Sequence, residues 1–174
     1  EEAIHSRAPE CTMYEYVLNN NKDHYDDIAL VYFGKKITYK ELIAAIDQTA
    51  AAFSHLGIKR GDVVTIQSLS IPQVVYTIYA LSKIGAVANL IFANANADAV
   101  KASMAETDSH VLVVMEPIFN AIRDKLSNAN LSAIIVMSIQ DEMDFVTKTI
   151  YSIATKAKTV KSEGCLLAWN AFYT

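Results

Sequence analysis

The sequence contains few glycines, and they lie far apart. There are five in 174 residues, at positions 34, 57, 61, 85 and 164. Phosphate-binding loops of the G-x-G-x-x-G and G-x-x-x-x-G-K-[S/T] kinds need closely spaced glycines, because the backbone must approach the phosphates. The chain has neither loop, and it also lacks the G-x-S-x-G turn of serine hydrolases and the H-E-x-x-H motif of zinc proteases.

Cysteine is scarcer still, since the chain has only Cys11 and Cys165, at its opposite ends. Two distant cysteines have no metal-binding spacing, and they favour free thiols in a reduced intracellular protein. A single disulfide between them is the alternative. We therefore expect a cytoplasmic location.

No stretch of the chain is apolar for long enough to cross a membrane. The most apolar region, Ile71 to Ala95, is interrupted by Lys83, Gly85 and Asn89, whereas a spanning helix needs about 18 or more uninterrupted apolar residues. The first residues, Glu1 to His5, have neither the basic nor the apolar segment of a secretory signal. We expect no membrane span.

Clustered positive charge is missing as well. The net charge is −4, and no run of Lys and Arg is longer than two. Nucleic-acid binding needs clustered basic residues, so this class of function is disfavoured. The hydrophobic fraction of 52% and the charged fraction of 20% instead predict a well-buried parallel sheet or a large partner surface.

The most informative stretch that is present runs from Ile37 to Gln67. Thr38 and Glu41 have the spacing of a capping box, which predicts a helix start, and Gly57 is placed to end the helix. A short β-branched strand follows at Val63–Gln67. One face of the predicted helix is mostly apolar, through Leu42, Ile46, Thr49, Phe53 and Leu56.

Similar signals mark further helices. Thr12 with Glu15 and Ser70 with Gln73 have capping-box spacing, and either Asn94 or Asn96 can cap a third helix. We expect Leu69 and Val74 to form a hydrophobic staple, the helix after Pro72 to end at Gly85, and another helix to open at Pro117. Residues 28–33 predict a strand, and residues 34–36 predict a tight turn that makes a hairpin.

Strand-like runs alternate with these helices. They lie at residues 63–67, 86–92, 110–114 and 133–136. This alternation predicts an α/β fold, a three-layer α/β/α arrangement with a mostly parallel sheet. We expect a single domain over 1–174, with regular βα repeats over 12–136.

Residues 137–174 are less regular. The periodicity predicts a helix from Asp141 to Lys156 through Met143, Val146, Ile150 and Ile153. A polar linker from Lys156 to Glu163 and a final apolar helix or strand over Leu166–Phe172 should follow.

No residue type forms a catalytic constellation. The histidines His5, His24, His55 and His110 are far apart; His55 suits the end of a helix dipole, and His110 suits a half-exposed start of a strand. The pairs Asp26–Asp27 and Asp141–Glu142 are interpreted as solvated ends, Lys59–Arg60 as an exposed turn, and Tyr76 with Tyr79 as core packing. We therefore assign no catalytic, cofactor-binding or metal-binding residue in this chain.

Four segments in the same order resemble a known family. They are Ile37-Thr38-Tyr39-Lys40-Glu41-Leu42, residues 57–64, residues 79–90, and residues 12–16 together with 28–30. These are similar to motifs of the adenylate-forming, AMP-binding synthetases, and in particular of bacterial acyl-CoA synthetases and long-chain fatty acid–CoA ligases. Order and spacing agree over residues 12–114, and Leu166–Phe172 resembles the short helix that precedes the phosphate loop of the family.

Several family motifs have no counterpart in the sequence. The Ser/Thr/Gly-rich loop ending in Pro-Lys-Gly, the aromatic-Gly-x-Thr-Glu segment, the ribose-binding Asp and the catalytic Lys do not occur. Asn94-Ala95-Asn96 replaces residues that are often Pro, Arg or Ser in relatives.

The resemblance implies that the chain is the N-terminal portion of an AMP-forming acyl-CoA synthetase. The whole enzyme would use ATP, Mg²⁺ and coenzyme A to convert a carboxylic acid into an acyl-adenylate and then a thioester. This portion would act as a scaffold without cofactors of its own. Its partners would be the remaining subdomains, and it would self-associate or expose an apolar face.

Two alternatives remain open at this point. The chain could belong to an adenylation module that loads the thiol of a carrier protein. It could instead be an α/β interaction domain without chemistry.

Overall fold

The computed structural model describes residues 9–126, 129–144, 147–151 and 162–173. Its centre is a parallel five-stranded sheet with the strand order β4-β3-β5-β6-β7. The strands are β3 (Val63–Gln67), β4 (Val87–Ile91), β5 (Val111–Met115), β6 (Ala133–Met137) and β7 (Leu166–Ala168). The predicted α/β class with a mostly parallel sheet is confirmed.

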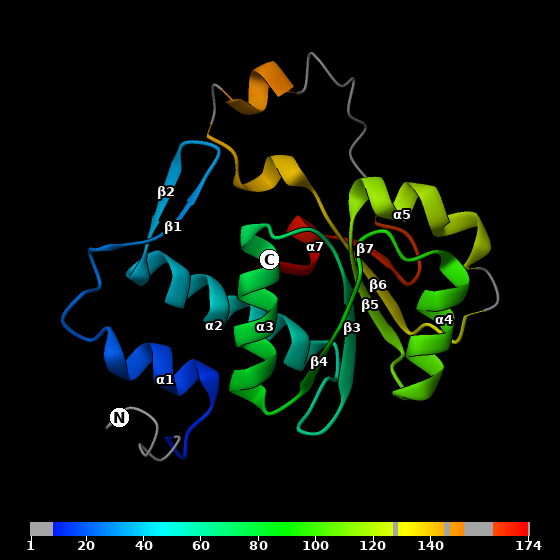
Figure 1. Ribbon diagram of the computed structural model, residues 1–174, viewed down its shortest axis with the longest axis horizontal. Coiled ribbons are helices and arrows are strands. Elements are labelled where there is room, and N and C mark those ends of the chain that lie inside the picture. The colour runs from blue at the N-terminus through cyan, green and yellow to red at the C-terminus, as the bar shows by residue number, and fades with distance from the viewer. Residues whose placement is uncertain (1–8, 127–128, 145–146, 152–161, 174) are drawn as a thin grey trace, which may run out of the picture.

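Helices cover both faces of this sheet (Figure 1). One face carries α2 (Tyr39–His55) and α3 (Pro72–Ile84), and the other carries α4 (Ala97–Glu106) and α5 (Glu116–Ile122). The predicted three layers are therefore present. On the first side, α1 (Met13–Asn20) packs against α3, and the hairpin of β1 (Ile28–Tyr32) and β2 (Lys35–Thr38) leads directly into α2.

The two faces of the sheet contribute to two separate hydrophobic clusters. Alternate strand residues such as Val113 and Ile135 pack with Phe53 of α2, whereas their neighbours Leu112 and Ile134 pack on the α4 side. Every residue of β5 and β6 is buried. Strands that are covered on both faces are apolar throughout, which explains the high hydrophobic fraction of the sequence.

The two ends of α2 form as the sequence predicts. The Thr38 backbone N–H donates to the Glu41 carboxylate at 2.8 Å, and the Glu41 N–H donates to the Thr38 hydroxyl at 3.2 Å. At the other end Gly57 has a φ of +92°, which allows the Ile58 N–H to reach the Phe53 carbonyl at 3.0 Å. Thr12 and Glu15 make the same box at α1.

The predicted capping box at α3 is wrong. The N-cap residue is Ile71, no side chain caps the helix, and Pro72 occupies its first turn. Gln73 is fully buried, and its amide Nε2 donates to the Ser138 carbonyl at 2.9 Å. The Gln73 amide thus satisfies a carbonyl far along the chain instead of the helix start. Because Ile71 and not Ser70 is the N-cap, Leu69 and Val74 do not occupy the two positions of a hydrophobic staple, and that prediction is wrong too.

The hairpin is present, but its turn lies at residues 33–34 and not at the predicted residues 34–36. Phe33 and Gly34 both have positive φ, at 45° and 83°, which is the geometry of a tight two-residue hairpin turn. Lys35 and Lys36 therefore belong to β2. Of the two asparagines predicted as possible caps of α4, Asn96 and not Asn94 provides the cap, and its side chain accepts from the Ala99 N–H at 2.9 Å.

The C-terminal region differs most from the prediction. Residues 139–142 form a short 3₁₀ helix, η3 (Ile139–Glu142), and Met143 is extended, so the predicted α-helix does not begin at Asp141. Residues 147–151 are helical. Val146, Ile153 and most of the predicted linker lie outside the described residues. The apolar segment forms both elements, since β7 joins the sheet and α7 (Trp169–Tyr173) follows it.

A further 3₁₀ turn, η2 (Arg123–Lys125), extends α5. Within the described residues, no helix has the length and apolar character that crossing a bilayer requires.

Candidate active-site edge of the sheet

Neighbouring connections separate at the carboxyl edge of the parallel sheet. The chain leaves β3 into α3 on one face, and it leaves the adjacent β5 into α5 on the opposite face (Figure 1). In open α/β sheets such a divergence leaves a crevice outside the strand ends, where ligands bind. This edge is therefore the candidate functional site.

A hollow of about 440 Å³ lies at this edge. The loop 93–96 after β4 forms one wall, and the first two turns of α5 form the other. Its lining residues are Ala93, Asn94, Ala95, Asn96, Pro117, Ile118, Ala121 and Ile122. None of them is ionisable, so the hollow suits an uncharged and largely apolar group.

Gln67, the last residue of β3, fixes the 93–96 loop, which forms one wall of the hollow. It is fully buried, and its amide Nε2 lies 2.8 Å from the Ala95 carbonyl and 3.3 Å from the Phe92 carbonyl. A buried amide that bridges carbonyls fixes an irregular loop that cannot bond itself. The signal in the sequence was a polar residue at the end of a β-branched run, which the strand prediction did not use.

A polar cluster occupies the carboxyl ends of β5, β6 and β7. Glu116 follows β5, Ser138 and Asp141 follow β6, and Asn170 follows β7. The Asn170 amide donates to Asp141 Oδ1 at 3.2 Å, and the Ser138 hydroxyl accepts from the Gln140 N–H at 3.4 Å. Burial raises the pKa of Glu116 and that of Asp141, and the hydrogen bond from Asn170 acts in the opposite direction on Asp141. Such carboxyls are typical of functional sites and of structural networks.

Glu142 ties η3 to the hairpin. Its carboxylate accepts from Lys35 Nζ at 2.6 Å, and its side chain is only 14% exposed. Burial is the main cause that raises the pKa of Tyr76, and the negative charge of Glu142 adds to it. The interpretation of Asp141–Glu142 as solvated is therefore wrong, because η3 directs both carboxylates into contacts with other elements.

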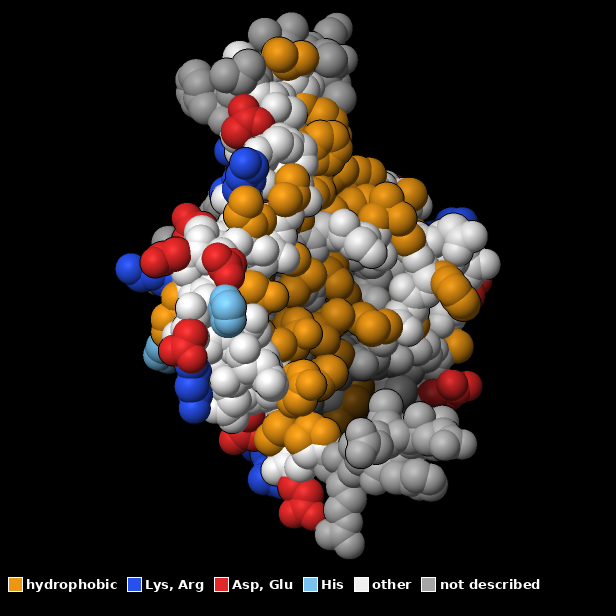
Figure 2. All heavy atoms as spheres, turned by 60° about the vertical axis from the view of Figure 1, so that its left-hand side comes forward, with side chains coloured by type: hydrophobic (Ala, Val, Ile, Leu, Met, Phe, Trp, Pro, Cys, Tyr) orange, Lys and Arg blue, Asp and Glu red, His pale blue; other side chains and the backbone are white. Residues whose placement is uncertain are grey.

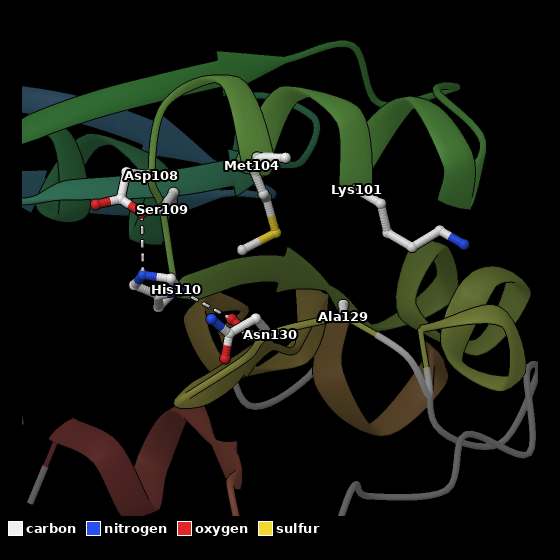
Figure 3. Close-up of a pocket in the computed structure, with 8 residues that line it drawn as sticks. Lys101, Met104, Asp108, Ser109, His110, Ala129 and Asn130 are labelled. Carbon is white, nitrogen blue, oxygen red and sulfur yellow. Dashed lines mark hydrogen bonds and ion pairs between the residues drawn. The ribbon is translucent and has the colours of Figure 1, made fainter.

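A second hollow, of about 400 Å³, lies at the opposite, amino edge of the sheet between α4 and the chain before β6 (Figure 3). His110 stands at one side, with Nδ1 at 3.0 Å from the Asn130 carbonyl and Nε2 at 3.3 Å from Asp108. The Ser109 hydroxyl donates to the Val111 carbonyl and is not aligned with the imidazole as a nucleophile. His110 is 44% exposed, which confirms its interpretation as a half-exposed structural residue.

The comparison with protein families shows which family the chain belongs to. Residues 18–165 match the profile of a family described as "AMP-binding enzyme". The chain belongs to the AMP-binding enzyme family.

Similar curated proteins of this family are acetyl-coenzyme A synthetases. The protein of Bartonella henselae is 33% identical over 106 residues, covering 58% of this chain and 16% of that protein. The protein of Penicillium chrysogenum is 32% identical over 97 residues, covering 52% of this chain and 14% of that protein. The chain thus spans a small fraction of the length of the relatives that it matches.

Solved structures show the same fold. An anthranilate CoA ligase, AuaEII, in complex with anthranoyl-AMP matches 95% of this chain with a TM-score of 0.76 at 17% identity. Coronafacic Acid Ligase from Pectobacterium brasiliense matches 93% with a TM-score of 0.76 at 19% identity. This chain covers 28% and 29% of the two structures.

The described residues of this chain do not fit a Mg²⁺ or nucleotide phosphate site. They contain no group of three or more His, Cys, Asp or Glu side chains that could hold a metal ion. The sequence has no glycine-rich loop, and the carboxylates of Asp141 and Glu142 contact other residues of the chain. A phosphate cradle would need clustered backbone N–H groups or free cations.

The other residues considered from the sequence have structural surroundings. His24 pairs with Asp27 at 2.8 Å on the surface, His55 lies in the exposed last turn of α2, and Arg60 lies against Gly85. The thiols of Cys11 and Cys165 are free and exposed. Tyr76 is buried and Tyr79 half-buried in the core, which confirms their interpretation as core residues. His5 lies outside the described residues.

Proposed function

We propose that the whole protein to which these residues belong is an AMP-forming acyl-CoA synthetase. It would convert a carboxylic acid and ATP into an acyl-adenylate and pyrophosphate, and then transfer the acyl group to the thiol of coenzyme A. AMP is a good leaving group, so adenylation turns an unreactive carboxylate into an electrophile. Bound Mg²⁺ would supply charge stabilisation for the phosphates.

The match of residues 18–165 to the family carries this proposal. Coenzyme A as the acceptor is supported by the names of the relatives, which are acetyl-coenzyme A synthetases and a CoA ligase. These names differ in their acids, so the proposal extends to carboxylic acids as a class. The free thiols of Cys11 and Cys165 support a reducing, cytoplasmic location.

For the chain itself we propose the role of a scaffold. Its carboxyl-edge groups stabilise the fold: Gln67 holds a loop, Gln73 holds the start of η3, and Glu142 joins η3 to the hairpin. Residues outside this chain would supply the phosphate loop and the charge that stabilises the adenylation transition state.

Its remaining partner would be the rest of the protein, packed on an apolar face. Figure 2 shows hydrophobic side chains gathered in a band on one face, with most of the charged residues of that view to one side of it. Exposed apolar residues on α1 and on the hairpin include Met13, Tyr16, Ile28, Val31 and Phe33. A monomeric protein rarely exposes so many without a partner surface. A dye that reports hydrophobic surface should bind this chain, and less so after Val31→Lys; no binding would count against the proposal.

Acid-dependent ATP–pyrophosphate exchange tests the activity and the scaffold role separately. The whole protein, assayed with acetate, benzoate, anthranilate and a long-chain fatty acid, should exchange label with at least one acid and form AMP. The 174-residue chain should remain at the blank. Exchange by the chain alone would overturn the scaffold role only. Formation of ADP, or no AMP with any acid, would overturn the proposed activity.

A further inference from the structure

The strand β4 has a free side. It is the last strand of the sheet, and it pairs only with β3. The Val87 N–H donates to the Asp62 carbonyl on the β3 side at 2.8 Å. Because successive residues of a strand direct their backbone groups to opposite sides, the N–H and C=O of Ala88 and Leu90 point outward. Within the described ranges, no strand or turn bonds to these groups.

The other edge of the sheet is closed by its own chain. The Ala168 N–H of β7 donates to the Ser162 hydroxyl at 3.0 Å. The segment before β7 turns back on it, with Glu163 and Leu166 exchanging backbone hydrogen bonds at 2.9 and 3.0 Å. The openness of β4 is therefore not a general property of this sheet.

The exposed side chains of β4 are apolar, whereas Ala88, Asn89 and Ile91 are half-buried. Val87 is 50% exposed, Leu90 58%, and Phe92 immediately after the strand 84%. No charged residue occurs between Lys83 and Asp98. Free edges of soluble proteins usually carry Lys, Pro or a bulge that prevents another strand from pairing there. β4 carries none of these in its regular register with β3.

We propose that a second copy of this chain pairs with the outer edge of β4, with the two β4 strands antiparallel about a two-fold axis beside Asn89. This arrangement places Ala88 of each copy opposite Leu90 of the other. Each of these residues then donates its N–H and accepts at its C=O, so every outward backbone group of the edge is satisfied. The interface is isologous, because both copies use the same surface.

Charge favours a second copy over a charged partner. The whole chain has a net charge of −4, so two copies repel one another weakly overall. The edge of β4 is neutral along its length, and two such edges meet without opposing like charges. A basic or acidic segment would find no complementary group there. The proposal does not depend on the proposed ligase activity.

Sedimentation equilibrium of the 174-residue chain tests the pairing. The wild-type chain should show a concentration-dependent monomer–dimer equilibrium, and Leu90→Lys should weaken it at least about tenfold, because it brings two positive charges into an apolar interface. Leu90→Pro should weaken it too by removing one outward N–H, a change that an edge strand tolerates. The matched control is Val31→Lys, which changes an apolar residue on the hairpin that is 67% exposed.

Amide exchange identifies the surface. The N–H groups of Ala88 and Leu90 should exchange slowly in the dimer and quickly in the Leu90→Lys monomer, whereas the inward N–H of Val87 stays protected in both. A chain that is monomeric at every concentration would overturn the proposal, as would equal weakening by Val31→Lys. Protection of Ala88 and Leu90 in a monomeric whole protein would also overturn it, because another strand of that protein would then cover the edge.

Discussion

Replacing Gln73 by methionine should destabilise the protein by about 0.5–1 kcal/mol. The change removes the amide that donates to the Ser138 carbonyl at 2.9 Å, and the loss of one such hydrogen bond costs about 0.5–1.5 kcal/mol, because the Ser138 carbonyl still accepts from the Asp141 N–H at 3.3 Å. Methionine keeps the length of the side chain, so little cavity forms. It also removes Gln73 Oε1, which is buried without a hydrogen-bond partner among the described residues, and this places the loss in the lower part of the range.

The alanine variant adds a packing loss to the lost hydrogen bond. Gln73 is fully buried, and Gln73→Ala also deletes its Cγ methylene, worth about 0.8 kcal/mol, and leaves a cavity that adds to the loss. We expect about 2 kcal/mol in total. The difference between the alanine and methionine variants therefore measures packing, and the methionine variant measures the hydrogen bond to Ser138.

Two matched controls separate this role from helix capping. Ser70 is exposed and caps nothing, so Ser70→Ala should change the free energy of unfolding by less than about 0.5 kcal/mol. A true capping box would make that loss about 0.5–2 kcal/mol. Gln48 also donates its amide to a backbone carbonyl, that of Tyr173, at 2.8 Å, but it is exposed. Water replaces this bond, so Gln48→Met should be nearly neutral.

Urea unfolding provides the measurement. The chain has one tryptophan, Trp169, which is buried in the same hydrophobic cluster as Phe53 and gives a local fluorescence signal beside far-UV circular dichroism. The free energy should fall with unchanged m-values if only the native contact is lost. A larger loss for Ser70→Ala than for Gln73→Met would refute this account of how α3 begins.

Two further predictions follow from single positions. Gly85 has a φ of +78°, and a Cβ there would lie 3.0 Å from Arg60 Cγ, so Gly85→Ala should destabilise by about 1–2 kcal/mol in thermal unfolding. Gly57→Ala, at a similar φ with open space around it, should cost less, and Arg60→Ala should remove the difference; equal losses would show that the Arg60 contact does not matter. Burial raises the pKa of Glu116, so its ionised form destabilises the folded state at neutral pH. Glu116→Gln should therefore raise the free energy of unfolding at pH 7, and the gain should vanish below about pH 4, where the carboxyl is protonated in both states; a constant gain across this pH range would contradict the assignment.

Local chemistry in the sequence was enough to predict the ends of α2 and the class of the fold. Thr38, Glu41 and Gly57 act on backbone groups within a few residues of themselves, so their effect does not depend on the rest of the chain. The continuous apolar runs of β5 and β6 require cover on both faces, which is a property of parallel sheets.

The same kind of reasoning failed where a side chain had a distant partner. Ser70 and Gln73 have the spacing of a capping box, yet Gln73 bonds a residue 65 positions away. Asp141 and Glu142 look like a solvated pair, yet Glu142 meets Lys35 across 107 positions. Spacing in the sequence carries no information about partners at such separations.

By itself the sequence determined the helix boundaries near strong caps, the parallel α/β class and the resemblance to AMP-binding enzymes. Each rests on residues close together in the chain or on motifs kept in order. Only the tertiary structure decided that Gln67 supports a loop at the carboxyl edge, that Glu142 joins η3 to the hairpin and that one edge of the sheet is open while the other is closed. These features arise where strands far apart in the sequence become neighbours, and their energies depend on burial that exists only in the folded chain.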